Sequence, residues 1–219
     1  MSLGLPSTLS ILLLAVLYWF PVRRWFAGWG TTPEERTRRM AGDQVIARPT
    51  HRATSAITIN APPEDIWPWL VQIGYQRGGL YSYDCLDRLF GFLDRPSANR
   101  ILPEFQRLAV GDKIYFGRQE LTVAVLEPCR ALVLSYKALG IEWVWEFALY
   151  PLDSHRTRFV DRSTERIPNT LLGSLMMRVL EPAAFIMNRR MLLGVKERAE
   201  TRRGQARARN DKIGSGAAA

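Results

Sequence analysis

Cysteine and histidine are scarce in this chain of 219 residues, which has two of each. Cys85 and Cys129 form no CxxC pair, so they give neither a disulfide framework nor a zinc site, and we expect reduced thiols. His51 and His155 are not near a plausible nucleophile in the sequence. A G-x-S-x-G elbow and a P-loop are also absent. We therefore expect no metal site, no cofactor and no catalytic residue of these kinds.

Charged side chains are absent from residues 1–22. Within them, residues 3–22 form an apolar segment that would extend roughly 30 Å as a helix, about the thickness of a bilayer's hydrocarbon core. Aromatic residues and then Arg23 and Arg24 follow, as at a membrane interface. A cleaved signal peptide fits less well, because no basic region precedes the apolar run and no small-x-small site follows it. We expect a single-pass anchor, residues 1–24, with the rest of the chain on the cytoplasmic side.

The net charge of +9 is concentrated on two flanks of the chain. Residues 23–52 and residues 196–212 each carry seven Lys/Arg against three Asp/Glu, whereas residues 53–195 carry sixteen against fifteen. A nucleic-acid-binding domain would carry the excess of positive charge on its own surface, so we expect no nucleic-acid partner. Basic flanks beside an apolar segment favour the surface of an anionic membrane.

Residues 57–91 predict the start of a folded domain. β-Branched residues end a strand, and Pro62–Pro63 then begin a helix whose first turn is acidic. Glycines mark the next loop, and residues 83–91 predict a second short helix. Asp84 and Asp87 share one face of that helix, which we interpret as a solvated face rather than an acid/base pair.

Alternating side chains and short turns predict five antiparallel strands, near residues 112–118, 120–127, 130–137, 141–151 and 155–165. The fourth strand has one strongly apolar face, which another element must cover. In the fifth strand, Arg162 alternates with Phe159 and Asp161, and we expect it to be a surface arginine. The apolar face of the fourth strand consists of Ile141, Trp143, Trp145, Phe147 and Leu149.

A long C-terminal helix is predicted to supply the cover. Its apolar residues recur every three or four positions, and Pro182 is expected to kink or split it. Its methionines are expected mainly to fill the core. Residues 204–219 are predicted to be a disordered tail. The recurring apolar residues of the helix form a stripe that consists of Leu172, Met176, Val179, Ala183, Ile186 and Met187.

Several segments together resemble the START/polyketide-cyclase superfamily, also called SRPBCC. They are APPEDIWPWL with the strand before it and the glycine loop after it, VGDK at 110–113, VLEPCRALVL at 125–134, TRF at 157–159 and MNRRMLLGVKERAE at 187–200. The resemblance covers about residues 50–200 and implies an α+β helix-grip fold, in which a curved antiparallel sheet wraps around a long C-terminal helix and leaves an apolar cavity. Cys129 departs from the family's pattern, since relatives often carry glycine in that turn.

The predicted organisation is therefore an anchor at residues 1–24, a basic connector at 25–50, a helix-grip domain at 51–203 and a tail at 204–219. The implied function is binding or transport of a lipid or other hydrophobic small molecule at a membrane, to which residues 3–22 anchor the chain. Candidate ligand-binding residues are Tyr81, Tyr83, Asp84, Trp143, Trp145 and Met176.

Two other functions stay open at this point. One is an enzyme like the polyketide cyclases and dehydrases, with Tyr83, Asp84 or Glu104 as acid or base. The other is an assembly or stress protein whose domain binds a partner chain. The sequence leaves the ligand and the oligomeric state open.

Overall fold

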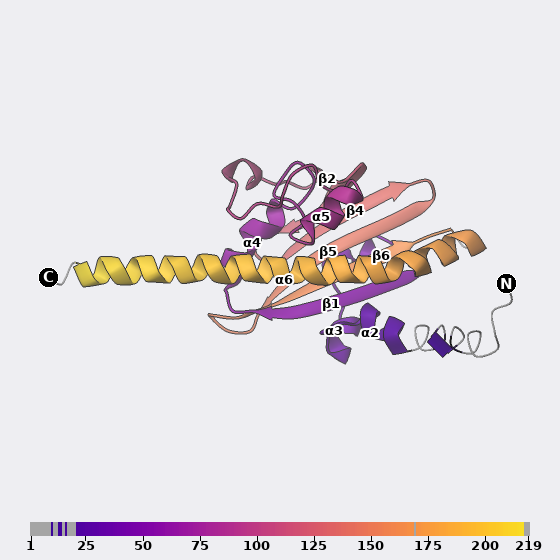
Figure 1. Ribbon diagram of the computed structural model, residues 1–219, viewed down its shortest axis with the longest axis horizontal. Coiled ribbons are helices and arrows are strands. Elements are labelled where there is room, and N and C mark those ends of the chain that lie inside the picture. Colours follow the sequence, from indigo (N-terminus) through magenta and orange to yellow (C-terminus); the bar gives the residue numbers. More distant parts are fainter. Residues whose placement is uncertain (1–9, 11–12, 15, 17–20, 169, 217–219) are drawn as a thin grey trace.

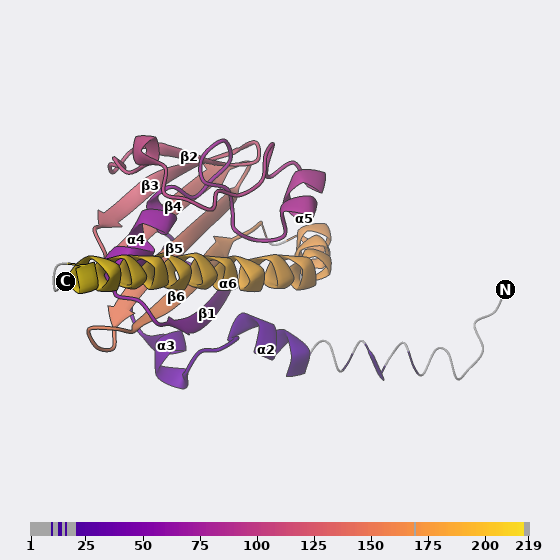
Figure 2. The same ribbon diagram turned by 60° about the vertical axis from the view of Figure 1, so that its left-hand side comes forward.

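The computed structural model describes residues 10, 13–14, 16, 21–168 and 170–216, except for the side chains of residues 171–174, 176–177 and 206–216. Six strands form one antiparallel sheet in the order β1-β6-β5-β4-β3-β2, and the long helix α6 (Leu171–Gly216) crosses one face of it (Figure 1, Figure 2). This confirms the predicted α+β helix-grip architecture. The strands are β1 (His51–Ile59), β2 (Lys113–Phe116), β3 (Gln119–Glu127), β4 (Ala131–Ala138), β5 (Ile141–Pro151) and β6 (Thr157–Arg166).

Tight turns join β2 to β6 into successive hairpins, as predicted. Leu139 and Gly140 both have positive φ, 52° and 77°, in the turn between β4 and β5. Two such residues in a row make a hairpin turn that suits the twist of the flanking strands. Cys129 also lies in the left-handed region, with φ 58°. Glycine adopts this backbone geometry most easily, and this turn keeps it although the residue is cysteine.

Three short helices lie in the chain between β1 and β2. Helix α4 (Pro63–Val71) begins with proline and carries acidic residues in its first turn, and its Ile66, Trp69 and Leu70 join the main core. The short helix α5 (Asp84–Leu89) confirms the second predicted helix. The 3-10 helix η3 (Pro103–Phe105) lies in the loop that leads to β2.

The face of the sheet opposite α6 is covered by residues that precede β1. Helix α2 (Arg23–Ala27) lies on the α6 side, where Phe26 stacks on Phe185, whereas helix α3 (Pro33–Thr37) and the 3-10 helix η2 (Ala41–Gln44) follow it towards the opposite face. Met40 packs against Ala148 and Val160, among other residues, and Ile46 packs against Val133 and Val144. The segment predicted only as a basic connector, residues 25–50, thus supplies part of the core.

Arg162 is buried in this outer layer, so the prediction of a surface arginine is wrong. Its guanidinium donates hydrogen bonds to the backbone oxygens of Glu35 (2.8 Å) and Arg38 (2.9 Å). It also pairs with the Asp43 carboxylate at 3.1 Å and donates to Oγ1 of Thr54 at 3.1 Å. The strand alternation placed Arg162 on the correct face, but it did not reveal that the preceding segment folds back over that face.

Helix α6 packs on the sheet through its middle rather than through the predicted stripe. Val179 is 70% exposed and Ile186 is 48% exposed, so these two members of the stripe do not pack against the sheet. The first turns, drawn in orange, run at an angle to the remainder, in keeping with a kink near Pro182 (Figure 1, Figure 2). The α6 residues buried in the main core are Met191, Leu192, Val195 and Ala199.

Gly194 permits the closest approach of α6 to the loop before α5, because a Cβ there would collide with the backbone oxygen of Tyr81. Replacing Gly194 by alanine is expected to lower the free energy of unfolding by about 1–3 kcal/mol through overpacking, measured by urea denaturation. Gly204 is the control, since it lies in the same helix with no atom near the position of a Cβ. Gly204→Ala should stabilise the chain by up to about 1 kcal/mol. Equal effects of the two substitutions would contradict the close contact.

The predicted disordered tail, residues 204–219, is corrected as far as Gly216, because α6 continues to that residue. Residues 205–209, QARAR, are good helix formers and continue the helix into this stretch. At the other end, most of the predicted span 3–22 lies outside the described residues. Among the described residues, no helix combines the length and the apolar character needed to cross a bilayer.

Candidate ligand-binding cavity

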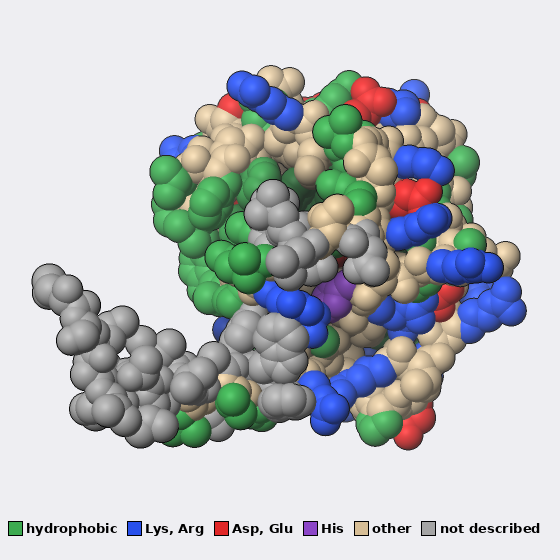
Figure 3. Space-filling view, turned by 90° about the vertical axis from the view of Figure 1, so that its right-hand side faces the viewer, with side chains coloured by type: hydrophobic (Ala, Val, Ile, Leu, Met, Phe, Trp, Pro, Cys, Tyr) green, Lys and Arg blue, Asp and Glu red, His purple; other side chains and the backbone are tan. Residues whose placement is uncertain are grey.

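A cavity of about 540 Å³ lies between the sheet and the first part of α6, with walls from α2, β1, β5, β6 and the α5 region. The main core packs beside it, where the middle of α6 meets the sheet. Figure 3 views the molecule from the end where α2 and the first turns of α6 lie, and it shows hydrophobic side chains gathered beside a hollow. The fold therefore leaves a pocket, partly open to the surface, next to a packed core.

Aromatic rings form the walls of the cavity. On the sheet side, Phe116 lies 5.7 Å from Trp143 between ring centroids, and Trp143 stacks on Trp145 at 5.6 Å. On the helix side, Phe26 of α2 stacks on Phe185 of α6 at 4.3 Å. Such rings offer a large apolar contact area, so an apolar molecule suits this space.

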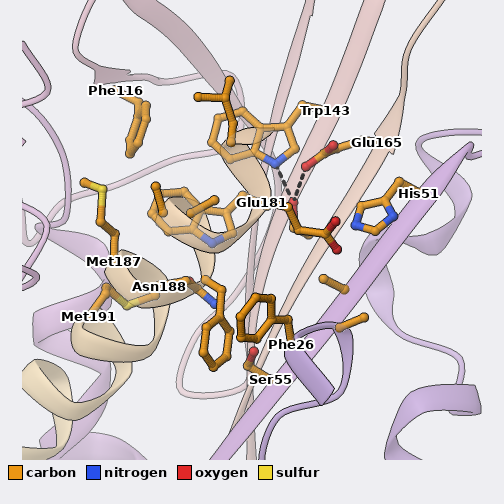
Figure 4. A pocket seen from close by; sticks show the side chains of 18 of the residues that line it. Phe26, His51, Ser55, Phe116, Trp143, Glu165, Glu181, Met187, Asn188 and Met191 are labelled. Carbon is orange, nitrogen blue, oxygen red and sulfur yellow. Dashed lines mark hydrogen bonds between the residues drawn. The ribbon is translucent and has the colours of Figure 1, made fainter. Parts of the chain in front are cut away.

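Hydrogen bonds hold the two indole rings of the wall in place, and that of Trp143 is drawn in Figure 4. Nε1 of Trp143 donates to Oγ of Ser163 at 2.8 Å, and Nε1 of Trp145 donates to Oδ1 of Asp161 at 2.7 Å. The amide of Asn188 on α6 donates to the other oxygen of Asp161 at 2.7 Å. Asp161 lies behind the wall, where burial raises the pKa of its carboxyl to about 7.

Acidic side chains gather at one end of the cavity, where His51, Glu165 and Glu181 converge (Figure 4). Oγ of Ser163 donates to Oε1 of Glu165 at 3.1 Å, and Nε of Arg23 donates to Oε2 of Glu181 at 2.7 Å. Burial raises the pKa of Glu165; the charge of Glu181 raises it further, and that of His51 lowers it. We call His51, Glu165 and Glu181 together the acidic end of the cavity.

Asp87 of α5 lies in the cavity wall and is fully buried, so its interpretation as part of a solvated face is wrong. Oγ of Ser82 donates to its Oδ2, while its Oδ1 has no hydrogen-bond partner among the described residues. Burial raises the pKa of Asp87 to about 6. The helical spacing correctly placed Asp84 and Asp87 near each other, but it did not show that α5 borders a cavity.

The residues predicted to bind a ligand fall into two groups. Trp143 and Trp145 line the cavity. Tyr81 does not line it, because its ring is buried in the core and its hydroxyl donates to the backbone oxygen of Trp69 at 3.0 Å. Tyr83 and Asp84 also lie outside the lining: Tyr83 is 39% exposed, and Asp84 accepts from Oγ of Ser97 at 2.7 Å. The side chain of Met176 lies outside the described residues, and Glu104, named as an acid or base, is exposed on η3.

The polar residues that border the cavity were not predicted. The alternation of β6 was a usable signal, because Phe159, Asp161, Ser163 and Glu165 share one face of the strand. No comparable signal marked Glu181, which lies between Val179 and Ala183 of the helix stripe and is not one of its apolar positions.

Metal chemistry has no visible support in the part of the chain that the structure describes. No three His, Cys, Asp or Glu side chains there are grouped so that they could hold a metal ion. Cys85 is exposed, Cys129 is partly buried, and both are free thiols.

The buried carboxyl of Asp161 predicts a pH-dependent stability. Its pKa is raised from 3.8 to about 7, so the folded chain keeps a proton that the unfolded chain releases. The free energy of unfolding should therefore fall as the pH rises from about 4 to about 7, by up to roughly 4 kcal/mol from this group. Asp161→Asn should reduce that fall, measured by urea denaturation at several pH values. Asp94→Asn, at an exposed site, is the control, and an equally steep fall in Asp161→Asn would refute the assignment.

Comparisons with known proteins find structural likenesses only. No family model matches the chain, and no curated protein matches it. A protein of Mesorhizobium loti is 15% identical, with 69% of this chain and 98% of that chain covered and a TM-score of 0.41. The Zhui aromatase/cyclase of Streptomyces sp. R1128 is 13% identical, with 68% and 94% covered and a TM-score of 0.35. A protein of Nitrosospira multiformis is 13% identical, with 69% and 99% covered and a TM-score of 0.41.

Proposed function

We propose that this chain binds a lipid or other hydrophobic small molecule in the cavity between its sheet and α6. The observation that carries the proposal is an aromatic-walled space of about 540 Å³ inside a helix-grip architecture. Small-molecule sites commonly have volumes of about 300–1,000 Å³ and mostly apolar linings. The resemblance of the sequence to the START/polyketide-cyclase superfamily supports the same function.

A membrane location is the second part of the proposal. Residues 3–22 are uncharged, and Arg23, directly after them, forms an ion pair with Glu181 at the acidic end of the cavity. An anchor that ended here would hold the cavity close to the bilayer. A hydrophobic guest would then have a short path from the lipid to the protein. A reporter enzyme fused after Ala219 tests the predicted cytoplasmic side, since activity confined to the outside would contradict it.

Native mass spectrometry of the full chain, extracted in mild detergent, tests the binding proposal. The expected spectrum contains the chain together with a hydrophobic molecule retained from the cells or taken up from an added mixture of such molecules. A spectrum of bare chain under both conditions would remove the support for a carrier.

Acid/base catalysis is the alternative function, and Asp87 is the observation in its favour. Tyr83, Asp84 and Glu104 do not line the cavity, whereas Asp87 does, with its pKa raised by burial to about 6. A carboxyl of that pKa can give or take a proton near neutral pH. The test compares the mass of the guest released from the unchanged chain with that from Asp87→Asn. A different mass indicates that Asp87 takes part in a reaction, and the same mass favours binding alone.

A further inference from the structure

The polar atoms of the cavity lining restrict the chemical class of molecule that can bind there more than the aromatic walls do. Three lining residues, Asp87, Glu165 and Glu181, each have one carboxylate oxygen that is buried and has no hydrogen-bond partner among the described residues. These atoms are Oδ1 of Asp87, Oε2 of Glu165 and Oε1 of Glu181. The other buried side-chain atoms without a partner belong to residues outside the lining.

The second oxygen of each carboxylate fixes its orientation. Ser82 holds Asp87, Ser163 holds Glu165, and Arg23 holds Glu181. The unpartnered oxygens are therefore not free to turn away without breaking an existing hydrogen bond. Asp87 provides the firmest case, because its side chain is fully buried in the wall.

Buried polar atoms in folded proteins almost always have a hydrogen-bond partner. Each unpartnered atom of this lining is a carboxylate oxygen, which in the ionised group accepts hydrogen bonds and cannot donate them. What completes the site must therefore donate hydrogen bonds. A carboxylate or phosphate guest would instead place a negative charge beside these acidic groups, which is unfavourable.

We infer that the guest is an apolar molecule that carries a hydrogen-bond donor, an ammonium or a hydroxyl group, and is not an anionic amphiphile. The inference rests on the proposed binding function and narrows it. The apolar part lies among the rings of Phe116, Trp143 and Phe185, while the donor reaches Asp87 or the acidic end of the cavity.

A competition among three amphiphiles with the same alkyl chain tests the inference. The full chain in mild detergent receives an equimolar mixture of dodecylamine, dodecanol and dodecanoate, and native mass spectrometry identifies the adduct by its mass. We expect the amine, the alcohol or both to be bound at least tenfold more than the carboxylate. The ratio of amine to alcohol then distinguishes an ammonium from a hydroxyl guest.

Two neutral variants locate the effect. Asp87→Asn and Glu165→Gln each remove the negative charge of one unpartnered carboxylate, so at least one of them should reduce the preference severalfold. Glu104→Gln, at an exposed site on η3, should leave the preference unchanged. Equal or greater binding of dodecanoate overturns the inference, although the binding function stands. A preference that neither variant alters also overturns the inference and leaves the binding function standing. The absence of every adduct overturns the binding function itself.

Discussion

Replacing Arg162 by alanine is expected to lower the free energy of unfolding by about 3–5 kcal/mol, the typical cost of breaking a buried ion pair by removing one partner. The guanidinium joins the Asp43 carboxylate and the backbone oxygens of Glu35 and Arg38 to β6. Without it, these acceptors would remain buried beside Glu146, whose own pKa is already raised by burial. Urea denaturation at neutral pH measures the change.

The control for this prediction is Arg130→Ala. Arg130 also forms an ion pair, with Glu127 at 3.3 Å, but its side chain is 79% exposed. The expected change is within about 0.5 kcal/mol, because exposed pairs contribute little to stability. If the two substitutions cost the same, Arg162 does not fasten the outer layer to the sheet.

Replacing Ala53 by tryptophan is expected to reduce the occupancy of the cavity by at least tenfold, which corresponds to about 1.4 kcal/mol of binding free energy. Ala53 lies in the cavity lining on β1, paired with Ser163 of β6. An indole at this position would project into the space beside Trp143, where the guest is proposed to lie. Because it fills a hollow and does not enlarge a packed core, we expect the chain to stay folded.

Native mass spectrometry gives the occupancy of the Ala53→Trp variant, and circular dichroism checks its fold. Ala109→Trp is the matched control, since Ala109 is exposed in the loop before β2. It should bind as the unchanged chain does. Full occupancy in a folded Ala53→Trp variant would show that the guest lies elsewhere.

Side-chain periodicity predicted the architecture because it determines which face a residue occupies. The apolar face of β5 agrees with the structure for this reason. Periodicity does not determine what covers a face, so Arg162 was expected in solvent although it is buried beneath residues 35–43. The covering segment is rich in charged residues, and its few apolar residues gave no sign that they join the core.

The candidate site was harder to predict for a related reason. An apolar stripe on a helix has the same pattern whether it packs on a sheet or borders a hollow. The stripe of α6 was therefore expected to grip the sheet, whereas the packed residues, such as Leu192 and Val195, follow it in the sequence. Asp87 and Glu181 are ordinary acidic residues in the sequence, and only the arrangement of α5 and α6 brings them to one cavity.

The central claim is that a hydrophobic guest lies against Trp143 and Trp145, and the indole N–H signals of the full chain test it most directly. The chain has seven tryptophans, and tryptophan-labelled protein gives one such signal for each. Substitution of Trp143 or Trp145 by phenylalanine assigns the two signals from the wall. Addition of dodecylamine should shift these two signals and leave that of Trp69, in the packed core, unchanged. Constant signals for Trp143 and Trp145 at saturating dodecylamine and dodecanol would contradict the account.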